Sequence, residues 1–284
     1  MNPEHSKKIA RELQLSEKQV DVTAQLLDDG STIPFISRYR KEATGSLDEI
    51  VIGAVRDRLH QLRELDKRRD AIVKSLSERE LLTKELREKL MAAETIAVLE
   101  DIYLPFKPKR RTRATIARER GLQPLADLIM KQDDVDLLKE ATNYIDLEKG
   151  VETAEDALQG ARDIIAEHIS EDQVARAAIR ECFTDRGLIK TKVIGVKAEE
   201  AIKYKDYFDW EEPVKRVPSH RLLAMMRGEK EAFLMLHIRP DEKDALRLLE
   251  DHFVANGNGV SEQVQMAVVD GYKRLLSPSM ENEI

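Results

Sequence analysis

The chain has 284 residues, enough for one large domain or two smaller ones, and 36% of them are charged. Its one cysteine, Cys182, excludes an internal disulfide and a cysteine-based zinc cage. The N-terminal residues are charged and amphipathic, unlike a signal peptide, and no apolar run approaches the roughly 18 residues that cross a bilayer. We therefore expect a soluble, cytoplasmic protein without a membrane partner.

The formal net charge of -7 hides an asymmetry along the chain. Residues 1–132 carry 26 Lys and Arg against 22 Asp and Glu, whereas residues 133–284 carry 21 against 32. We accordingly expect two regions, an N-terminal helical region (1–132) and an acidic helical region (133–284). A positive half joined to a negative half fits a surface that faces nucleic acid, and chance drift between two solvated halves is the alternative.

Helix signals follow one another in the first region. Ser16 and Gln19 form a capping box, and Gly30 closes that helix. A short helix is expected after Thr32, because Pro34 suits its first turn.

One long central helix is expected from Leu47 to about Leu76, roughly 45 Å in length, with Ser46 and Glu49 as its capping box. Its apolar stripe consists of Val51, Val55, Leu62, Leu65, Ile72 and Leu76. A line of basic residues on another face, Arg56, Arg63, Lys67 and Lys74, is expected to be a solvated surface in the main.

Arg58 and Arg69 fall on the apolar stripe of this helix. A buried guanidinium without a partner is very costly. Both side chains should therefore pair with carboxylates, or with backbone carbonyls that a neighbouring segment supplies.

Two more helices, Thr83 to Ala92 and Thr95 to Tyr103, lead into a stretch rich in positive charge. This basic cluster comprises Lys107, Lys109, Arg110, Arg111, Arg113, Arg118 and Arg120, with Glu119 as the one acid among them. Pro105 and Pro108 break the helix, and Thr112 is a plausible N-cap for a short helix that ends at Gly121. The cluster is thus expected on a loop and on the first turns of a helix.

The second region mixes helices with a small β element. Helices over 152–170 and 171–187 should meet near Ser170, and residues 188–194 and 231–238 read as two strands of an antiparallel ribbon. Residues 241–276 read as helix, turn and helix. The expected fold is therefore mainly α, a multi-helix scaffold with one long central helix and a small antiparallel β element in the second half.

The helix–turn–helix pattern of 241–276 does not by itself indicate a DNA reader. Gln263 and Gln265 could meet base edges, but the second helix has no Lys or Arg before Lys273. A DNA-reading helix usually supplies charge for phosphates, so a hairpin used for packing is the preferred interpretation.

Sequence motifs for catalysis are missing. The chain has no P-loop, GxGxxG, GxSxG or HExxH motif. His168 and Glu171 share a helix face and could hold a metal ion, but a surface pair is the preferred interpretation, and Cys182 is expected to be a small core residue. We therefore predict no enzyme, no cofactor and no metal site.

The basic cluster is the strongest local signal of function. Its cations could release counterions from phosphates, and Tyr103 and Phe106 are near enough in sequence to stack on a base. The same charge could dock an acidic protein or pair with the acidic half of this chain, and composition leaves these alternatives open.

Three stretches carry a family resemblance: TIPFISRYRKEATGSLDE (32–49), LEDIYLPFKPKRRTRATIARERGLQPLA (99–126) and DYFDWEEPVKRVPSHRLLAMMRGEKEAFL (206–234). They resemble the N-terminal region of the bacterial Tex family, and DGYKRLLSPSMENEI (270–284) resembles the segment leading out of it. The family is named as a transcription accessory protein and is similar in architecture to a eukaryotic elongation factor that is also a histone chaperone.

The resemblance implies a longer parent protein, because family members continue into a YqgF-type ribonuclease H-like domain, helix–hairpin–helix modules and an OB-fold RNA-binding domain. It implies a non-catalytic scaffold whose basic cluster flanks a path for RNA or DNA without reading sequence. Within 34–42 it adds three cations, Arg38, Arg40 and Lys41, with Phe35 and Tyr39 interleaved. The alternatives are that these two rings are core anchors, and that the region docks proteins of the transcription machinery.

Overall fold

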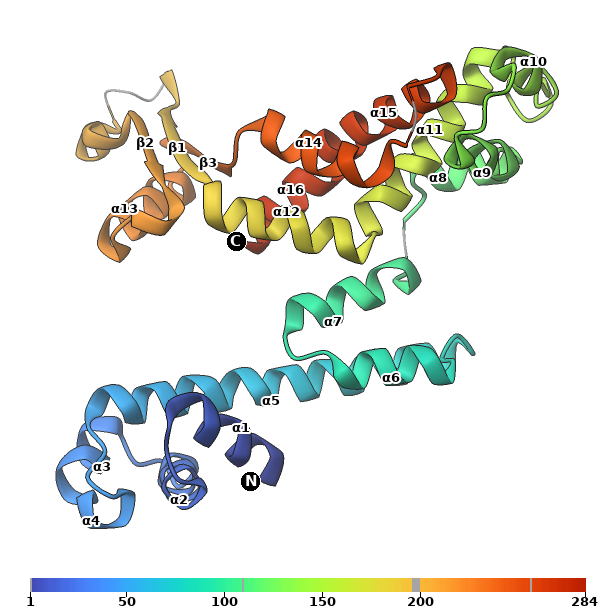
Figure 1. Cartoon of the computed structure of the whole chain (residues 1–284). Coiled ribbons are helices and arrows are strands. Elements are labelled where there is room, and N and C mark those ends of the chain that lie inside the picture. Colours follow the sequence, from blue (N-terminus) through green and yellow to red (C-terminus); the bar gives the residue numbers. More distant parts are fainter. Residues whose placement is uncertain (1, 109, 196–199, 256) are drawn as a thin grey trace. The chain divides into compact units, whose positions relative to one another are not determined.

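The computed structural model describes residues 2–108, 110–195, 200–255 and 257–284. The fold is mainly α with a small three-stranded antiparallel sheet, as the sequence predicts (Figure 1). The chain forms two compact units, Met1–Phe106 and Lys107–Ile284, called here the N-terminal and the C-terminal unit. The predicted division of the chain at residue 132 was based on the charge of the two regions, whereas the two units are defined by their compactness. The division at residue 132 stays a prediction.

The N-terminal unit consists of helices. They are α1 (Pro3–Leu13), α2 (Glu17–Asp28), α3 (Ile33–Tyr39), α4 (Lys41–Thr44), α5 (Glu49–Glu78), α6 (Lys84–Ala92) and α7 (Ile96–Tyr103), followed by a 3-10 turn at Leu104–Phe106. Ser16 and Gln19 form the predicted capping box of α2, and Thr32 caps α3. Thr83 and Thr95 cap α6 and α7, where the sequence predicts these helices to begin.

The predicted long helix is α5, whose 30 residues correspond to about 45 Å. Its predicted apolar stripe is buried except for Val51, which is half-buried, and the helix packs against α1, α2, α3, α6 and α7. The predicted capping box is wrong. Asp48 caps the helix instead, accepting a hydrogen bond of 2.8 Å from the backbone N–H of Val51, while Ser46 takes a left-handed backbone conformation after Gly45.

Arg58 and Arg69 are both paired, as their place on the apolar stripe predicts. Arg58 donates two hydrogen bonds, of 2.7 and 2.9 Å, to the carboxylate of Glu12 on α1. Arg69 donates to Asp66 and to the carbonyl oxygens of Leu90 and Ala93, at the end of α6. These contacts attach α1 and α6 to the long helix.

The C-terminal unit combines helices with the sheet. Its elements are α8 (Arg113–Glu119), α9 (Gln123–Lys131), α10 (Leu137–Thr142), α11 (Ala154–Glu171), α12 (Gln173–Arg186), β1 (Leu188–Val193), β2 (Asp209–Pro213), α13 (Ser219–Lys230), β3 (Leu234–Arg239), α14 (Glu242–Phe253), α15 (Gly259–Gly271) and α16 (Ser277–Glu283). Short 3-10 turns lie at Ile202–Tyr207 and Val214–Arg216.

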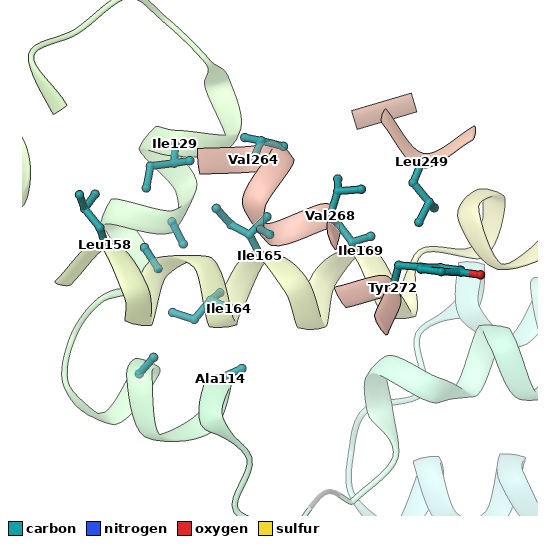
Figure 2. Packing of buried hydrophobic residues seen from close by; sticks show 14 of the residues in the cluster. Ala114, Ile129, Leu158, Ile164, Ile165, Ile169, Leu249, Val264, Val268 and Tyr272 are labelled. Atoms are coloured by element: carbon teal, nitrogen blue, oxygen red, sulfur yellow. The ribbon is translucent and has the colours of Figure 1, made fainter. Parts of the chain in front are cut away.

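Helix α11 is the centre of the largest apolar core. It contacts α8, α9, α10 and α15, and the predicted break near Ser170 separates it from α12. Figure 2 shows Ile165 and Ile169 of α11 beside Val264 and Val268 of α15, with Ala114 of α8 across from them. The predicted hairpin of 241–276 is therefore present as α14 and α15, and α15 packs its apolar side on α11.

The helix that begins with α15 continues through a π-helical turn, Tyr272–Leu276, into α16. Pro278 lacks an N–H group, so it cannot donate to the carbonyl of Arg274. The backbone N–H of Ser277 bonds instead to the carbonyl of Tyr272, five residues earlier. This change of register lets the helix pass the proline.

The sheet has the strand order β2-β1-β3, and both pairings are antiparallel. The two predicted strands are β1 and β3, with Leu188 opposite Arg239 and Val193 opposite Leu234. Strand β2 was not predicted, because its residues DWEEP include Asp and Pro, which are rare in strands. An edge strand tolerates acids and proline, and both discourage pairing with another chain.

Among the described residues, no helix is long and apolar enough to cross a membrane.

Candidate nucleic-acid interface

The basic cluster begins on irregular backbone, as its prolines predict. Pro105 lies in the 3-10 turn that follows α7, and α8 begins only at Arg113. Thr112 caps α8 by accepting a hydrogen bond of 3.0 Å from the N–H of Thr115, and Gly121 closes it with a φ of 84°. Lys109 lies outside the described residues.

The cluster divides into two kinds of cation. Lys107, Arg110 and Arg113 are exposed, and none of them has an ion pair with another described residue. Arg111 and Arg118 are paired, Arg111 with Glu119 at 2.9 Å and Arg118 with Glu167 at 2.6 Å. Lys107, Arg110 and Arg113, called here the open cations, are thus the exposed members of the cluster without an ion pair among the described residues, whereas Arg120 is half-buried.

The buried acid Glu167 explains why Arg118 of the basic cluster points toward α11. Its side chain on α11 is 7% exposed, and it accepts hydrogen bonds from both Thr112 and Arg118 of the α8 segment. A buried carboxylate needs such donors and a countercharge to remain ionised. The alternative of internal pairing with the acidic half is therefore correct for Arg118, though not for the open cations.

A second carboxylate, Asp163, lies one turn earlier on α11. Burial raises its pKa, although the nearby charges of Arg274 and Arg113 favour the ionised form. Arg274 bridges it to Asp270, with contacts of 3.3 Å to Asp163 and 2.5 Å to Asp270. The surface around Arg113, in the first turn of α8, therefore carries both negative charges, from Asp163 and Asp270, and positive charges.

The second predicted set of cations lies at α3 and α4 in the N-terminal unit. Arg38 is exposed and 4.0 Å from Glu49, and Lys41 is exposed at the start of α4. The guanidinium carbon of Arg40 lies 5.5 Å from the centre of the Phe35 ring. Phe35 and Tyr39 are exposed, so neither ring is a core anchor. The two sets lie in different units, and each is treated as a separate surface.

Glu167, the acid that holds Arg118, was not predicted as part of the site. Its partners precede it by 49 and 55 residues, and no local pattern marks such a pairing. The two glutamines of α15 were considered as base readers, but both amides are engaged within the protein. Gln263 accepts a hydrogen bond from Arg162, and Gln265 donates one of 3.0 Å to Glu250.

In the part of the chain that the structure describes, no group of three or more His, Cys, Asp or Glu residues could hold a metal ion. His168 is exposed on α11. Cys182 is buried in the core, as predicted, and burial raises the pKa of its thiol.

Two family descriptions match the chain. Residues 3–77 match the Tex-like protein N-terminal domain, and residues 132–278 match the Tex central region-like family. The chain belongs to the Tex family. The basic cluster falls between the two matched regions.

Curated relatives support the assignment. The chain is 41% identical to YdcI of Bacillus subtilis over 280 residues, which are 97% of this chain. It is 42% identical to the transcriptional accessory protein Tex of Neisseria gonorrhoeae over 82% of its length. A human protein named for an S1 RNA-binding domain is a more distant relative, 28% identical over 72% of this chain.

This chain corresponds to only a part of each relative. It spans 39% of the B. subtilis protein, 31% of the N. gonorrhoeae protein and 21% of the human protein. What these names say about the whole proteins bears on this chain only as a proposal.

Proposed function

We propose that this chain is a non-catalytic scaffold of a cytoplasmic transcription accessory protein, and that its basic cluster contacts RNA or DNA without reading the base sequence. The observation that carries the proposal is the set of open cations, Lys107, Arg110 and Arg113, exposed and unpaired among the described residues. Cations of this kind bind phosphates and release counterions, and they carry no information about base order.

Two of the relatives' names support this function. One relative is named a transcriptional accessory protein, and another is named for an RNA-binding domain. Neither name assigns a contact to the region matched here, so the support concerns the parent protein.

The non-catalytic part of the proposal rests on chemistry that the chain does not offer. Its sequence contains no phosphate-binding loop, and its described residues contain no metal-binding cluster. Metal-dependent cleavage of RNA or DNA by the purified chain, lost on a point substitution within it, would show that this part is wrong.

Charge reversal of the open cations tests the nucleic-acid contact. The triple variant Lys107→Glu, Arg110→Glu, Arg113→Glu should bind labelled single-stranded RNA and duplex DNA more weakly than the unmodified chain. Each lost phosphate contact should reduce the slope of log affinity against log salt by roughly 0.7–0.9. Circular dichroism should show an intact fold, because none of the three residues has an ion pair with a described residue, although the charge of Arg113 favours the ionised form of Asp163.

A matched control separates a local contact from a general effect of charge. Arg56→Glu, Lys67→Glu, Lys74→Glu makes the same change in net charge on exposed residues of α5. Equal affinities for the two triple variants would mean that the cluster is not the contact.

Docking to proteins of the transcription machinery is the second candidate function. The observation that favours it is the exposed pair Leu223 and Met226, one turn apart on α13 and 65% and 49% exposed. Replacing both with Asp should abolish binding to purified RNA polymerase if this face docks it. Unchanged nucleic-acid affinity in the same variant would separate the two functions.

A further inference from the structure

The N-terminal unit exposes a pair of aromatic rings on the short helix α3. Tyr39 is 70% exposed and Phe35 40%, and the centres of the two rings are 5.4 Å apart. Helix α3 buries its other side through Ile36 and Ser37. Phe35 and Tyr39 are one helical turn apart, so they form a single apolar surface that faces solvent.

Neither Phe35 nor Tyr39 belongs to the buried apolar clusters of this unit. Buried contacts of α3 go through Ile36, which forms an apolar core with Leu47 and Ile52. A folded protein gains nothing from leaving adjacent aromatic rings in water, and adjoining exposed rings mark binding sites more often than isolated apolar residues do.

Cations surround the two rings. Arg38 and Arg40 flank Tyr39 in the sequence, Lys41 follows, and Arg40 lies over the Phe35 ring. Two acids of the same segment are already engaged: Asp48 caps α5, and Glu49 accepts a hydrogen bond from Ser37 and lies 4.0 Å from Arg38. Glu42 remains as an exposed acid. The surface therefore presents aromatic rings together with guanidinium groups, and its cations are only partly balanced by acids.

We infer that Phe35 and Tyr39 form a stacking platform for unpaired nucleobases, with Arg38, Arg40 and Lys41 contacting the adjoining phosphates. This inference rests on the proposed function, because it deepens nucleic-acid contact by naming a second site and the chemical group that the site takes. Every base has a flat π face, so the platform binds bases of any identity, but only where they are not already stacked in a duplex.

The ring geometry fixes how a base is held. The two rings already touch, since their separation lies within the usual range for an aromatic pair, so no base enters between them. Arg40 covers part of Phe35, and Tyr39 is the more exposed ring. A base therefore stacks on Tyr39, while Phe35 supports that ring from its side.

Stacking and phosphate binding differ in their response to salt. Binding of cations to phosphates weakens as the salt concentration rises, because the release of counterions then contributes less favourable free energy. Stacking of a base on a ring releases no counterions. Loss of the platform should thus lower affinity at every salt concentration and leave the salt slope unchanged. Loss of the open cations should change the slope.

The test compares Phe35→Ala, Tyr39→Ala with the control Leu138→Ala, Leu147→Ala, which removes two apolar side chains, 66% and 74% exposed, that belong to no proposed binding surface. Three probes are titrated against the 284-residue chain: a labelled oligodeoxyadenylate strand, an abasic DNA strand of the same length, and a blunt DNA duplex. The aromatic variant should bind the strand with bases at least about fivefold more weakly, the loss expected for one stacked base. Its affinity for the abasic strand and for the duplex should not change.

A conservative variant separates the rings from the fold. Tyr39→Phe keeps the ring and should bind the strand with bases as the unmodified chain does. Unchanged affinity of the aromatic variant for that strand would overturn the platform, as would an equal loss on the abasic strand, and either result would favour a protein as the occupant. Failure of the unmodified chain to bind any probe would overturn the proposed function as well.

Discussion

Arg118 of α8 donates a hydrogen bond of 2.6 Å to Glu167 of α11, a carboxylate with only 7% of its side chain exposed. Thr112 donates to the other oxygen of the same carboxylate at 3.0 Å. The segment with the highest positive charge in the chain thus uses one of its arginines to hold α8 on α11. Structural and ligand-facing roles are divided between neighbouring residues of one cluster.

This division predicts opposite effects for two arginines of α8. Arg118→Ala should lower the free energy of unfolding by about 1–3 kcal/mol, because it removes a charged donor from a buried carboxylate. Arg113→Ala should change stability by less than about 0.5 kcal/mol, because Arg113 is exposed and has no ion pair with a described residue. Urea denaturation measures both.

When the same two variants are titrated with nucleic acid, their losses of affinity should rank in the opposite order to their losses of stability. Arg113→Ala should weaken binding, and Arg118→Ala should do so only slightly where the fold persists. Equal stability losses would show that Glu167 does not depend on Arg118.

The two arginines on the apolar stripe of α5 give a graded prediction. Arg69 is 12% exposed and has three acceptors, so Arg69→Ala should cost about 2–5 kcal/mol. Arg58 is 25% exposed and bonds chiefly to Glu12, so Arg58→Ala should cost less, though more than about 0.5 kcal/mol.

Arg56 is the control for this series, because it is an exposed arginine on the same helix whose ion pair is with its neighbour Asp57. Arg56→Ala should cost under about 0.5 kcal/mol. Thermal melts of the three variants test the order, and three similar midpoints would contradict it.

The periodicity of apolar residues predicted α5, because its buried residues recur at helical spacing over many turns. The same periodicity placed Arg58 and Arg69 on the apolar side of the helix, and this position predicted that each has a partner. The sequence could not predict whether Phe35 and Tyr39 are buried. Their spacing of four residues suits a core face as well as a surface face, and tertiary packing by Ile36 decides between them.

Two further misses have local causes. Asp48 and Ser46 are both good caps, and the left-handed turn at Gly45 and Ser46 selects the later one. Strand β2 is short and acidic, and only its pairing with β1 makes it a strand. In the candidate site, the pairing of Arg118 depends on a contact across 49 residues, which local sequence does not encode.

Asp163 provides a prediction about pH. Burial raises its pKa above the ordinary value of 3.8. As the pH rises through 3.8, Asp163 loses its proton in the unfolded chain before it does so in the folded protein. Asp163 therefore lowers the stability of the folded state progressively, until the pH exceeds the raised pKa that it has in the folded protein. Asp163→Asn removes this effect, so its stability relative to the unmodified chain should increase as the pH rises from below 3.8 to neutrality.

Asp156 supplies a control of opposite sign on the same helix. Its hydrogen bonds with the Thr153 side chain and backbone, in the capping box of α11, lower its pKa. The unmodified chain should therefore gain stability relative to Asp156→Asn over the same rise in pH. Chemical denaturation at several pH values measures both differences, and parallel pH profiles for the two variants would contradict the assignment.

Gly271 lies at a close approach between α15 and α11. A Cβ atom at this position would lie 3.0 Å from the carbonyl oxygen of Ala166 and 3.3 Å from its Cα. Both are backbone atoms of α11, so the contact can be relieved only by moving one helix against the other. Gly271→Ala should accordingly cost about 1–3 kcal/mol of unfolding free energy, although alanine favours a helix by itself.

Gly259, at the start of the same helix, has no atom within 4 Å of a built Cβ. Gly259→Ala should therefore be neutral or should stabilise the protein by up to about 1 kcal/mol, through the lower entropy of the unfolded chain. Urea denaturation of the two variants isolates the helix contact, because the chemical change is identical. Similar stability for both would mean that α15 can shift on α11 without loss, and that the core around Ile165 and Val268 tolerates a wider spacing than the one described.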